Sequence, residues 1–298
     1  MAITEAGGVS YHVDGYLMKL WEKHSLAAMK KHNSDKVYIV DGRERSGKTW
    51  FAMQQMGALD KEAFENVDKF LSRICFTPEE FHKAITETEN GVVIFDEAFR
   101  GMSSRSALSK VNKKLIQVLM EMGQNNNIVF IVLPSFFMLD VYPAMLRSDG
   151  LFHITQDSKS LMRSFWGYNR VDKNRIYQVG IKKGWTYGGK VRLRGRFTGK
   201  FPGGDKFMNA YLKKKKDALT NMGKAAEEEE EEHYLLGQRR LAILRWYETW
   251  KSDEKNKELD QNDFIKLLPG IGTQMTRGSL RVLLSQARKD AKTRRLGV

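Results

Sequence analysis

The feature that most constrains this chain is the segment from Gly42 to Thr49, which has the pattern Gly-x4-Gly-Lys-Thr. An apolar run at residues 36–41 precedes it, and residues 47–56 have the composition of a helix. Glycines let the backbone curl so that successive N–H groups point inward, and the start of a helix adds partial positive charge. The segment therefore predicts a phosphate-binding loop, the Walker A motif, between a buried strand and a helix.

The residue types in this loop have expected roles. Lys48 can reach the β- and γ-phosphates and would take part in catalysis, and the Thr49 hydroxyl can bind Mg²⁺. The residues predicted to contact the nucleotide are Gly42, Arg45, Ser46, Gly47, Lys48, Thr49 and Trp50. No Asn-Lys-x-Asp sequence is present to indicate guanine, so ATP with Mg²⁺ is the expected ligand.

A second apolar run at residues 91–96 ends in Asp96 and is followed by Glu97. This pattern is typical of a Walker B strand, in which Asp96 would hold Mg²⁺ through water and Glu97 would be the general base on the attacking water. The alternative is a strand that ends in two solvated acids. An adjacent Asp-Glu pair favours hydrolysis over phosphoryl transfer to a small molecule, which needs no base for water.

Ser135 follows a third apolar run at residues 127–133. Open α/β sheets bind ligands at the carboxyl ends of their strands, so Ser135 is expected near the γ-phosphate as a sensor. The alternative is an ordinary turn serine after Pro134.

Apolar runs alternate with segments of helical character along the first half of the chain. Helices are predicted at residues 16–31, 47–56, 109–122 and 141–146, with a further helix starting at Thr77-Pro78. Strands are predicted at residues 36–41, 91–96, 127–133 and 151–155. Strands that are apolar on both faces favour an α/β fold with a mostly parallel sheet covered by helices on both sides, and we assign this ATPase core to residues 1–156.

The pattern changes beyond residue 156. Residues 163–166, 175–181 and 191–197 alternate basic with apolar residues, which predicts short antiparallel strands in a basic β-rich and helical extension at residues 157–226. Six glutamates at residues 227–232 indicate an acidic linker or helix extension, assigned to residues 227–238. Residues 239–298 predict a helical module that is similar to a helix-turn-helix in outline, with helices at 239–251, 262–268 and 276–295. Thr276 would cap the last helix, and its apolar residues, Val282 among them, would face inward.

Positive charge is concentrated in the second half of the chain. The net charge is +14, and residues 151–226 alone carry 18 Lys and Arg against four Asp and Glu. Such asymmetry suggests a polyanionic partner, most simply DNA. The residues predicted to contact nucleic acid are Arg192, Arg194, Arg196, Lys213, Lys214, Arg277 and Arg281. The alternatives are an edge strand protected by charge and a small interaction bundle.

Two features of the sequence bear on the cellular compartment. Cys75 is the only cysteine, so no disulfide can form within the chain. The longest apolar run, at residues 128–139, is too short to cross a bilayer, and no leader is visible at the start. A cytoplasmic protein without a membrane segment is expected, in the host cytoplasm if the source is viral.

The motifs at residues 42–49, Asp96-Glu97 and Ser135 resemble those of the additional-strand catalytic-glutamate P-loop ATPases. Within this class, residues 36–156 are similar to the HerA–FtsK group, which includes zonula-occludens-toxin-like and viral genome-packaging ATPases. The group commonly carries Gln where Ser135 stands here. The resemblance implies a homo-oligomeric ring that moves DNA by ATP hydrolysis in the packaging or transfer of a viral or mobile element, with a capsid or portal-type protein as a further partner.

The resemblance also implies that an arginine from one subunit reaches the γ-phosphate held by its neighbour. Arg147 is the first choice for this arginine finger, with Arg100 and Arg105 as others. Two alternatives to a motor stay open. One is an ATP-dependent DNA-binding switch or loader that does not translocate, and the other is a small-molecule phosphotransferase.

Overall fold

The computed structural model describes residues 2–96, 105–123, 125–197, 200–256, 258–268 and 276–295. They form two compact units, Met1–Leu219 and Thr220–Val298, which are described separately below. Within the described residues, no helix has the length and apolar character needed to span a membrane.

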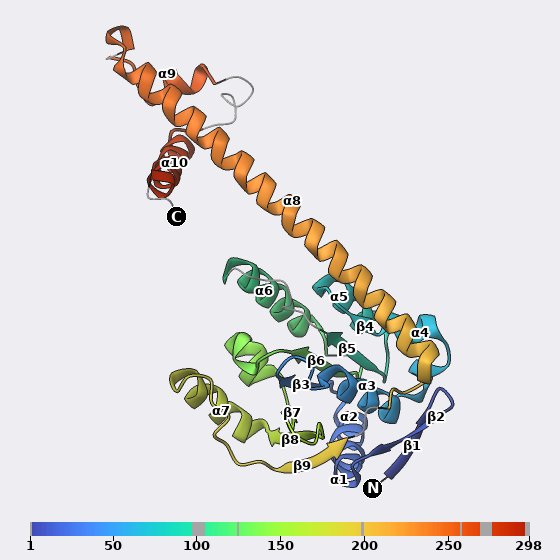
Figure 1. Ribbon diagram of the computed structural model, residues 1–298. Coiled ribbons are helices and arrows are strands. Elements are labelled where there is room, and N and C mark those ends of the chain that lie inside the picture. Colours follow the sequence, from blue (N-terminus) through green and yellow to red (C-terminus); the bar gives the residue numbers. More distant parts are fainter. Residues whose placement is uncertain are drawn as a thin grey trace. The chain divides into compact units, whose positions relative to one another are not determined.

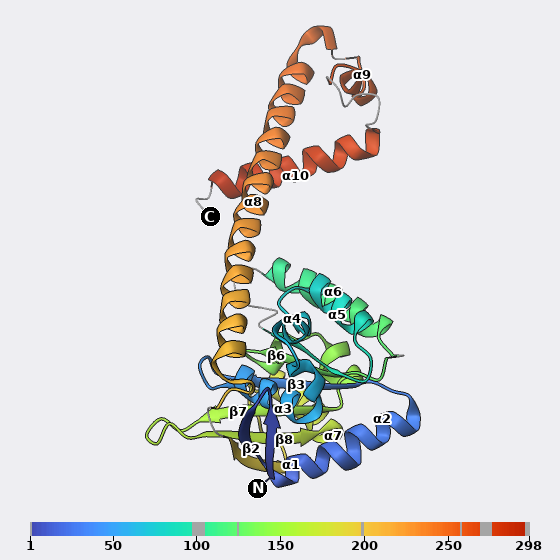
Figure 2. The same ribbon diagram turned by 90° about the vertical axis from the view of Figure 1, so that its right-hand side faces the viewer.

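The first unit begins with a two-stranded antiparallel hairpin that the sequence did not predict. Its strands are β1 (Ala2–Ala6) and β2 (Val9–Val13), joined by two glycines with positive φ. The helical run α1 (Gly15–Leu20), η1 (Trp21–Leu26) and α2 (Ala27–His32) follows and confirms the helix predicted at residues 16–31 (Figure 2). Asp14 starts this run, because its carboxylate accepts hydrogen bonds from the Tyr16 and Leu17 N–H groups.

A seven-stranded sheet forms the centre of the first unit (Figure 1). Its strands are β3 (Lys36–Gly42), β4 (Ile74–Cys75), β5 (Val92–Asp96), β6 (Ile128–Leu133), β7 (Gly150–Gln156), β8 (Arg163–Asn169) and β9 (Leu193–Phe197). The order is β4-β5-β6-β3-β7-β8-β9, in which the first five are parallel and β8 and β9 are antiparallel. The sheet confirms the predicted mostly parallel α/β fold.

The register of the sheet brings the ends of three buried strands to one edge. Asp41 of β3 lies beside Leu133 of β6, and Asp96 of β5 lies beside Val132. Because β3, β5 and β6 are parallel, the residues that follow them leave the sheet at the same side. Residues 42–49 and Ser135 therefore leave this edge beside Asp96.

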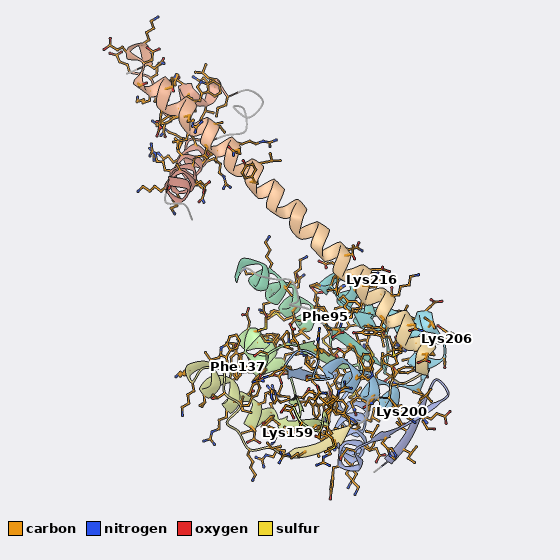
Figure 3. The ribbon with its side chains drawn as sticks, viewed as in Figure 1. Phe95, Phe137, Lys159, Lys200, Lys206 and Lys216 are labelled. Atoms are coloured by element: carbon orange, nitrogen blue, oxygen red, sulfur yellow. The ribbon has the colours of Figure 1, made fainter. Side chains whose placement is uncertain are left out.

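Helices cover both faces of the sheet, as predicted. The helical elements between the strands are α3 (Lys48–Leu59), η2 (Lys61–Phe64), α4 (Val67–Ser72), α5 (Pro78–Glu87), α6 (Arg105–Glu121), η3 (Phe136–Met138), η4 (Tyr142–Arg147) and α7 (Arg170–Lys182). One core joins Phe95 of β5, which lies inside the first unit in Figure 3, to Phe81 of α5, Leu115 of α6 and Ile176 of α7. On the opposite face, Phe51 of α3 packs against aromatic rings of β7 and β8.

The strand predicted at residues 175–181 is wrong, since these residues lie within α7. Ile176, Tyr177 and Gly180 are buried on one side of this helix, and Asn169 caps it by accepting from the Asp172 N–H group. Alternating apolar residues over seven positions are compatible with a strand and with one face of a short helix. The cap at Asn169 favours the helix.

The other two predicted antiparallel strands exist as β8 and β9, but they extend the central sheet. The assigned boundary at residue 156 falls between β7 and β8, which are paired from Gly150–Asn169 to Gln156–Arg163. The first compact unit instead continues to Leu219. Alternating residues predict a strand but do not identify its sheet, because the pairing partner is not encoded locally.

The second unit is helical, as predicted. Helix α8 (Gly204–Ser252) begins in the first unit and ends in the second, and the acidic run at residues 227–232 is part of it. It is followed by η5 (Glu254–Asn256), α9 (Gln261–Lys266) and α10 (Arg277–Arg295). The core of this unit contains Leu244, Trp250, Phe264, Ile265, Leu268, Leu280, Leu284 and Ala287. Thr276 caps α10 as predicted, whereas Val282, which was expected inside, is 71% exposed.

Candidate nucleotide-binding site

The loop between β3 and α3 has the backbone that the glycine pattern predicts. Gly42, Arg45 and Gly47 all have positive φ, and α3 begins at Lys48 without a side-chain cap. A Cβ atom at Gly42 would lie 2.2 Å from the Ile154 carbonyl oxygen, so only glycine fits there. The Ser46 hydroxyl is buried in the loop without a hydrogen-bond partner. This uncapped helix start with a spare buried hydroxyl has the donors that a phosphate group requires.

The Lys48 side chain folds back over this loop. Its ammonium group donates to the carbonyl oxygens of Gly42 and Arg43, each at 2.8 Å. The cation is therefore held beside the first turn of α3, where a phosphate would lie. Two residues predicted to contact the nucleotide have other surroundings. Arg45 is exposed, and the ring of Trp50 packs edge-on against Phe201 at 5.1 Å.

The two residues predicted to hold Mg²⁺ are in contact. The Thr49 hydroxyl of α3 donates to the Asp96 carboxylate of β5, with oxygen separations of 3.1 and 3.3 Å. Asp96 is fully buried. Mg²⁺ prefers oxygen ligands and keeps several waters, so one hydroxyl and one carboxylate beside a phosphate-binding loop fit this ion.

Two side chains of α8 also reach Asp96, a contact that no local pattern of residues predicts. The Tyr211 hydroxyl donates to Asp96 Oδ2 at 2.7 Å, and the Lys215 ammonium lies 3.8 Å from the same oxygen. Lys215 also donates to the Tyr211 hydroxyl at 3.1 Å, and the ring of Trp50 meets that of Tyr211 edge-on. Both residues were predicted only as part of the basic β-rich and helical extension, because nothing local links position 211 to position 96.

A buried carboxylate, Asp41, organises the neighbouring part of the edge. It accepts hydrogen bonds from the Phe136 N–H group at 2.9 Å and from the Tyr187 hydroxyl, and it lies 2.9 Å from His153 Nδ1. The rings of His153 and Tyr187 stack at 4.0 Å. Burial raises the pKa of Tyr187, and the negative charge of Asp41 raises it further.

Ser135 lies next to this cluster, since it directly precedes Phe136, whose N–H group donates to Asp41. Its position at the carboxyl edge agrees with the predicted location, and its role as a sensor stays a prediction. Glu97 and Arg100 lie outside the described residues, as does the side chain of Arg105.

Arg147 is placed at the other edge of the sheet, just before β7 begins. Its Nε–H group donates to the Leu119 carbonyl oxygen at 3.2 Å, and its guanidinium lies 3.8 Å from Asp35. Only 18% of the side chain is exposed. It therefore lies away from the loop of its own chain, and a role opposite a neighbouring subunit stays a prediction.

The basic residues expected to contact nucleic acid fall into different surroundings. Arg194 and Arg196 are exposed on the edge strand β9, where they line a cavity of about 440 Å³ with Ser164 and Gly195, and Arg194 covers the ring of Trp166. Arg192 follows the same alternation, two positions before Arg194, but it precedes β9. Its guanidinium is bound by Asp172 of α7.

The two lysines of α8 also differ. Lys213 is exposed, whereas Lys214 donates to the carbonyl oxygens of Leu71 and Ile74 and pairs with Glu80 at 3.6 Å. Lys214 thus holds the start of α8 against the edge of the sheet formed by β4.

Within the second unit, Arg277 pairs with Asp260 at 3.1 Å and Arg281 donates to the Gln261 side chain at 3.3 Å. Arg281 also lines a cavity of about 560 Å³. The other residues around this cavity are Tyr247, Gln261, Leu284, Ser285, Arg288, Lys289 and Lys292. With four cationic side chains, this cavity is suited to an anionic ligand.

Comparisons with known proteins add a structural likeness but no family. No family model matches the chain, and no curated protein matches it. One solved structure similar to it is the N-terminal domain of zonular occludens toxin from Neisseria meningitidis, with 16% identity and a TM-score of 0.31 over 55% of this chain and 94% of that chain. This likeness is one of fold alone.

Proposed function

We propose that this chain is a Mg²⁺-dependent ATPase. The observation that carries the proposal is the contact of Thr49 with Asp96 at 3.1 Å, directly beside the uncapped start of α3 and the glycine loop. Residues 47 positions apart in sequence meet where the Walker A and Walker B patterns require a shared metal. An accidental glycine loop would not need a buried carboxylate at this position.

The residues of the chain have distinct proposed tasks. The loop N–H groups and the start of α3 bind phosphate oxygens, and Lys48 exchanges its contacts with the Gly42 and Arg43 carbonyl groups for contacts with the β- and γ-phosphates. Thr49 and Asp96 hold Mg²⁺, which when bound supplies positive charge that neutralises the phosphates. Glu97 directly follows Asp96 and is the proposed general base, and Ser135 is the proposed γ-phosphate sensor.

The second part of the proposal is that ATP hydrolysis acts on nucleic acid, with DNA favoured. Two surfaces support it: Arg194 and Arg196 on the edge strand β9, and the cavity around Arg281 in the second unit. Cationic surfaces of this kind track a phosphate backbone. The finer role, a ring that translocates DNA for packaging or transfer of a viral or mobile element, is proposed on the resemblance of the Walker motifs alone.

The test is ATP hydrolysis by the full chain with and without single- and double-stranded DNA, together with the particle mass. Lys48→Ala should abolish nucleotide binding, and Glu97→Gln should keep ATP binding but lower turnover by at least about 100-fold, the contribution typical of a general base. Lys61→Ala, at an exposed lysine of η2, is the matched control and should behave as wild type. Normal turnover in Glu97→Gln would remove Glu97 as the base.

The same assay separates a motor from a switch or loader. A motor predicts steady turnover that DNA stimulates and removal of a protein roadblock from DNA. Slow turnover without roadblock removal would favour a loader, and phosphate transfer to a small acceptor in place of water would favour a phosphotransferase.

A further inference from the structure

Arg163 lies at the edge of the sheet where the glycine loop begins, although its position in the sequence predicts no role there. It is the first residue of β8 and pairs with Gln156, the last residue of β7. Because β8 is antiparallel to β7, its start lies at the edge where β3 leads into the glycine loop.

The face of the sheet that Arg163 occupies is the face covered by α3. Side chains alternate along a strand, so Arg163 and Phe165 share a side of β8. Phe165 contacts Phe51 of α3, with ring centres 5.1 Å apart. Arg163, two residues nearer the edge, therefore lies beside the start of α3.

The contact with the loop is close. A Cβ atom built on Gly47 would lie 2.8 Å from Cδ, 3.0 Å from Nε and 3.4 Å from Cζ of Arg163. The guanidinium thus packs directly against the last glycine of the loop, next to Lys48 and the N–H groups of the first turn of α3. Only a residue without a side chain leaves it this room.

Among the residues that the structure describes, this guanidinium has no counter-charge. Its Nε–H group is buried without a hydrogen-bond partner, and no Asp or Glu of the part of the chain that the structure describes forms an ion pair with it. Arginine stays protonated in proteins, so it cannot relieve this by losing its charge. A buried donor without a partner is costly, and an anion beside Gly47 would satisfy it.

We propose that Arg163 binds the phosphate chain of the nucleotide within its own subunit. It would cover the site from the side of β8, and its planar donors suit phosphate oxygens. The inference rests on the proposed function, because the anion it requires is the nucleotide held by the same loop. Arg163 differs from an arginine finger, which comes from a neighbouring subunit.

Calorimetric titration of the full chain with ADP and with a non-hydrolysable ATP analogue tests this directly. Arg163→Ala should weaken binding about 10- to 100-fold, as expected for loss of a charge-assisted hydrogen bond. Arg163→Lys should recover part of the lost affinity, because lysine keeps the positive charge but lacks the planar guanidinium donors. Arg175→Ala, at an exposed arginine of α7, is the control and should bind as wild type.

Thermal unfolding distinguishes a ligand-binding role from a structural one. Without nucleotide, Arg163→Ala should melt at the wild-type temperature or higher, because a buried Nε–H group without a hydrogen-bond partner has been removed. With nucleotide, its rise in Tm should be smaller than that of wild type. A lower Tm without nucleotide, combined with unchanged affinity, would show that the side chain only supports the fold and would overturn the proposal.

The failure of this inference can be told apart from failure of the proposed function. If wild type binds no adenine nucleotide, the ATPase proposal fails and this inference fails with it. If wild type binds, Lys48→Ala does not, and Arg163→Ala binds as wild type, only the role of Arg163 is refuted.

Discussion

Lys173 illustrates how a single side chain can set the pH dependence of this protein. Its side chain is fully buried in α7, and its Nζ donates to the Ala144 and Met145 carbonyl groups and to the Asn174 side chain. Burial, helped by the positive charge of Arg170 and opposed by the negative charge of Asp149, lowers its pKa from 10.5 to about 7.

The direction of the resulting stability change follows from proton binding. Between pH 7 and 10.5 the unfolded chain holds a proton on Lys173 that the folded chain has released. The free energy of unfolding therefore rises as the pH increases through this window and falls as the pH drops toward 7. We expect the free energy of unfolding, measured in urea, to increase more between pH 7 and pH 9 in wild type than in Lys173→Met. The difference should be a few kcal/mol at most. Equal gains in the two proteins would contradict the assignment.

Asp41 marks the limit of what single residues reveal in a sequence. It was predicted only as the end of a buried strand, which is confirmed. Its hydrogen-bonding partners Phe136, His153 and Tyr187 lie 95, 112 and 146 positions later in the chain. Contacts of that separation depend on the order of strands in the sheet, and no local pattern encodes that order. Arg163 was missed for the same reason.

At the scale of elements, α8 offers a prediction about metal binding. Lys215 lies 3.8 Å from Asp96 Oδ2 with 18% of its side chain exposed, so its ammonium group competes with Mg²⁺ for that carboxylate. Because both groups are largely buried, removing the ammonium leaves the Asp96 carboxylate uncompensated and more available to another cation. Lys215→Ala should lower the Mg²⁺ concentration that gives half-maximal ATPase activity by about fivefold or more, which corresponds to about 1 kcal/mol of binding free energy.

Lys206, on the first turns of the same helix, is the matched control (Figure 3). It is exposed, and Lys206→Ala should leave the Mg²⁺ requirement unchanged. A higher Mg²⁺ requirement in Lys215→Ala would mean that Lys215 supports the metal site and does not compete with the metal.

The elements that could be predicted from sequence are those with strong local signals. Buried apolar runs gave β3, β5 and β6, and the Thr77-Pro78 pair gave the start of α5, where Thr77 accepts from the Glu80 N–H group. The β1–β2 hairpin was missed. Each of its strands has only five residues, which is too short for alternation alone to identify a strand.

At the scale of the whole molecule, the charge distribution predicts how DNA binding depends on salt. Arg194 and Arg196 are exposed on β9, whereas Arg192 is bound by Asp172. Of these three arginines, we therefore expect Arg194 and Arg196 to contact DNA phosphates. Changing Arg194 and Arg196 together to Ala should reduce the slope of log affinity against log salt by about 2. Arg175→Ala is the control, and an unchanged slope would place DNA binding elsewhere.

A parallel measurement on Arg281→Ala and Arg288→Ala, changed together, tests the cavity of the second unit. A smaller salt slope in this variant alone would assign DNA binding to the second unit. A smaller slope both here and in the Arg194 and Arg196 variant would assign it to both units.

The antiparallel return of β8 and β9 has a practical consequence for anyone who divides this protein. A fragment that stops at residue 156, where the composition changes, would strip β7 of its neighbour and leave a row of bare amide and carbonyl groups along it. Such a piece is a template for aggregation, and it would also have lost Arg163 and Tyr211. Dissection by limited proteolysis or truncation should therefore spare the chain as far as Leu219.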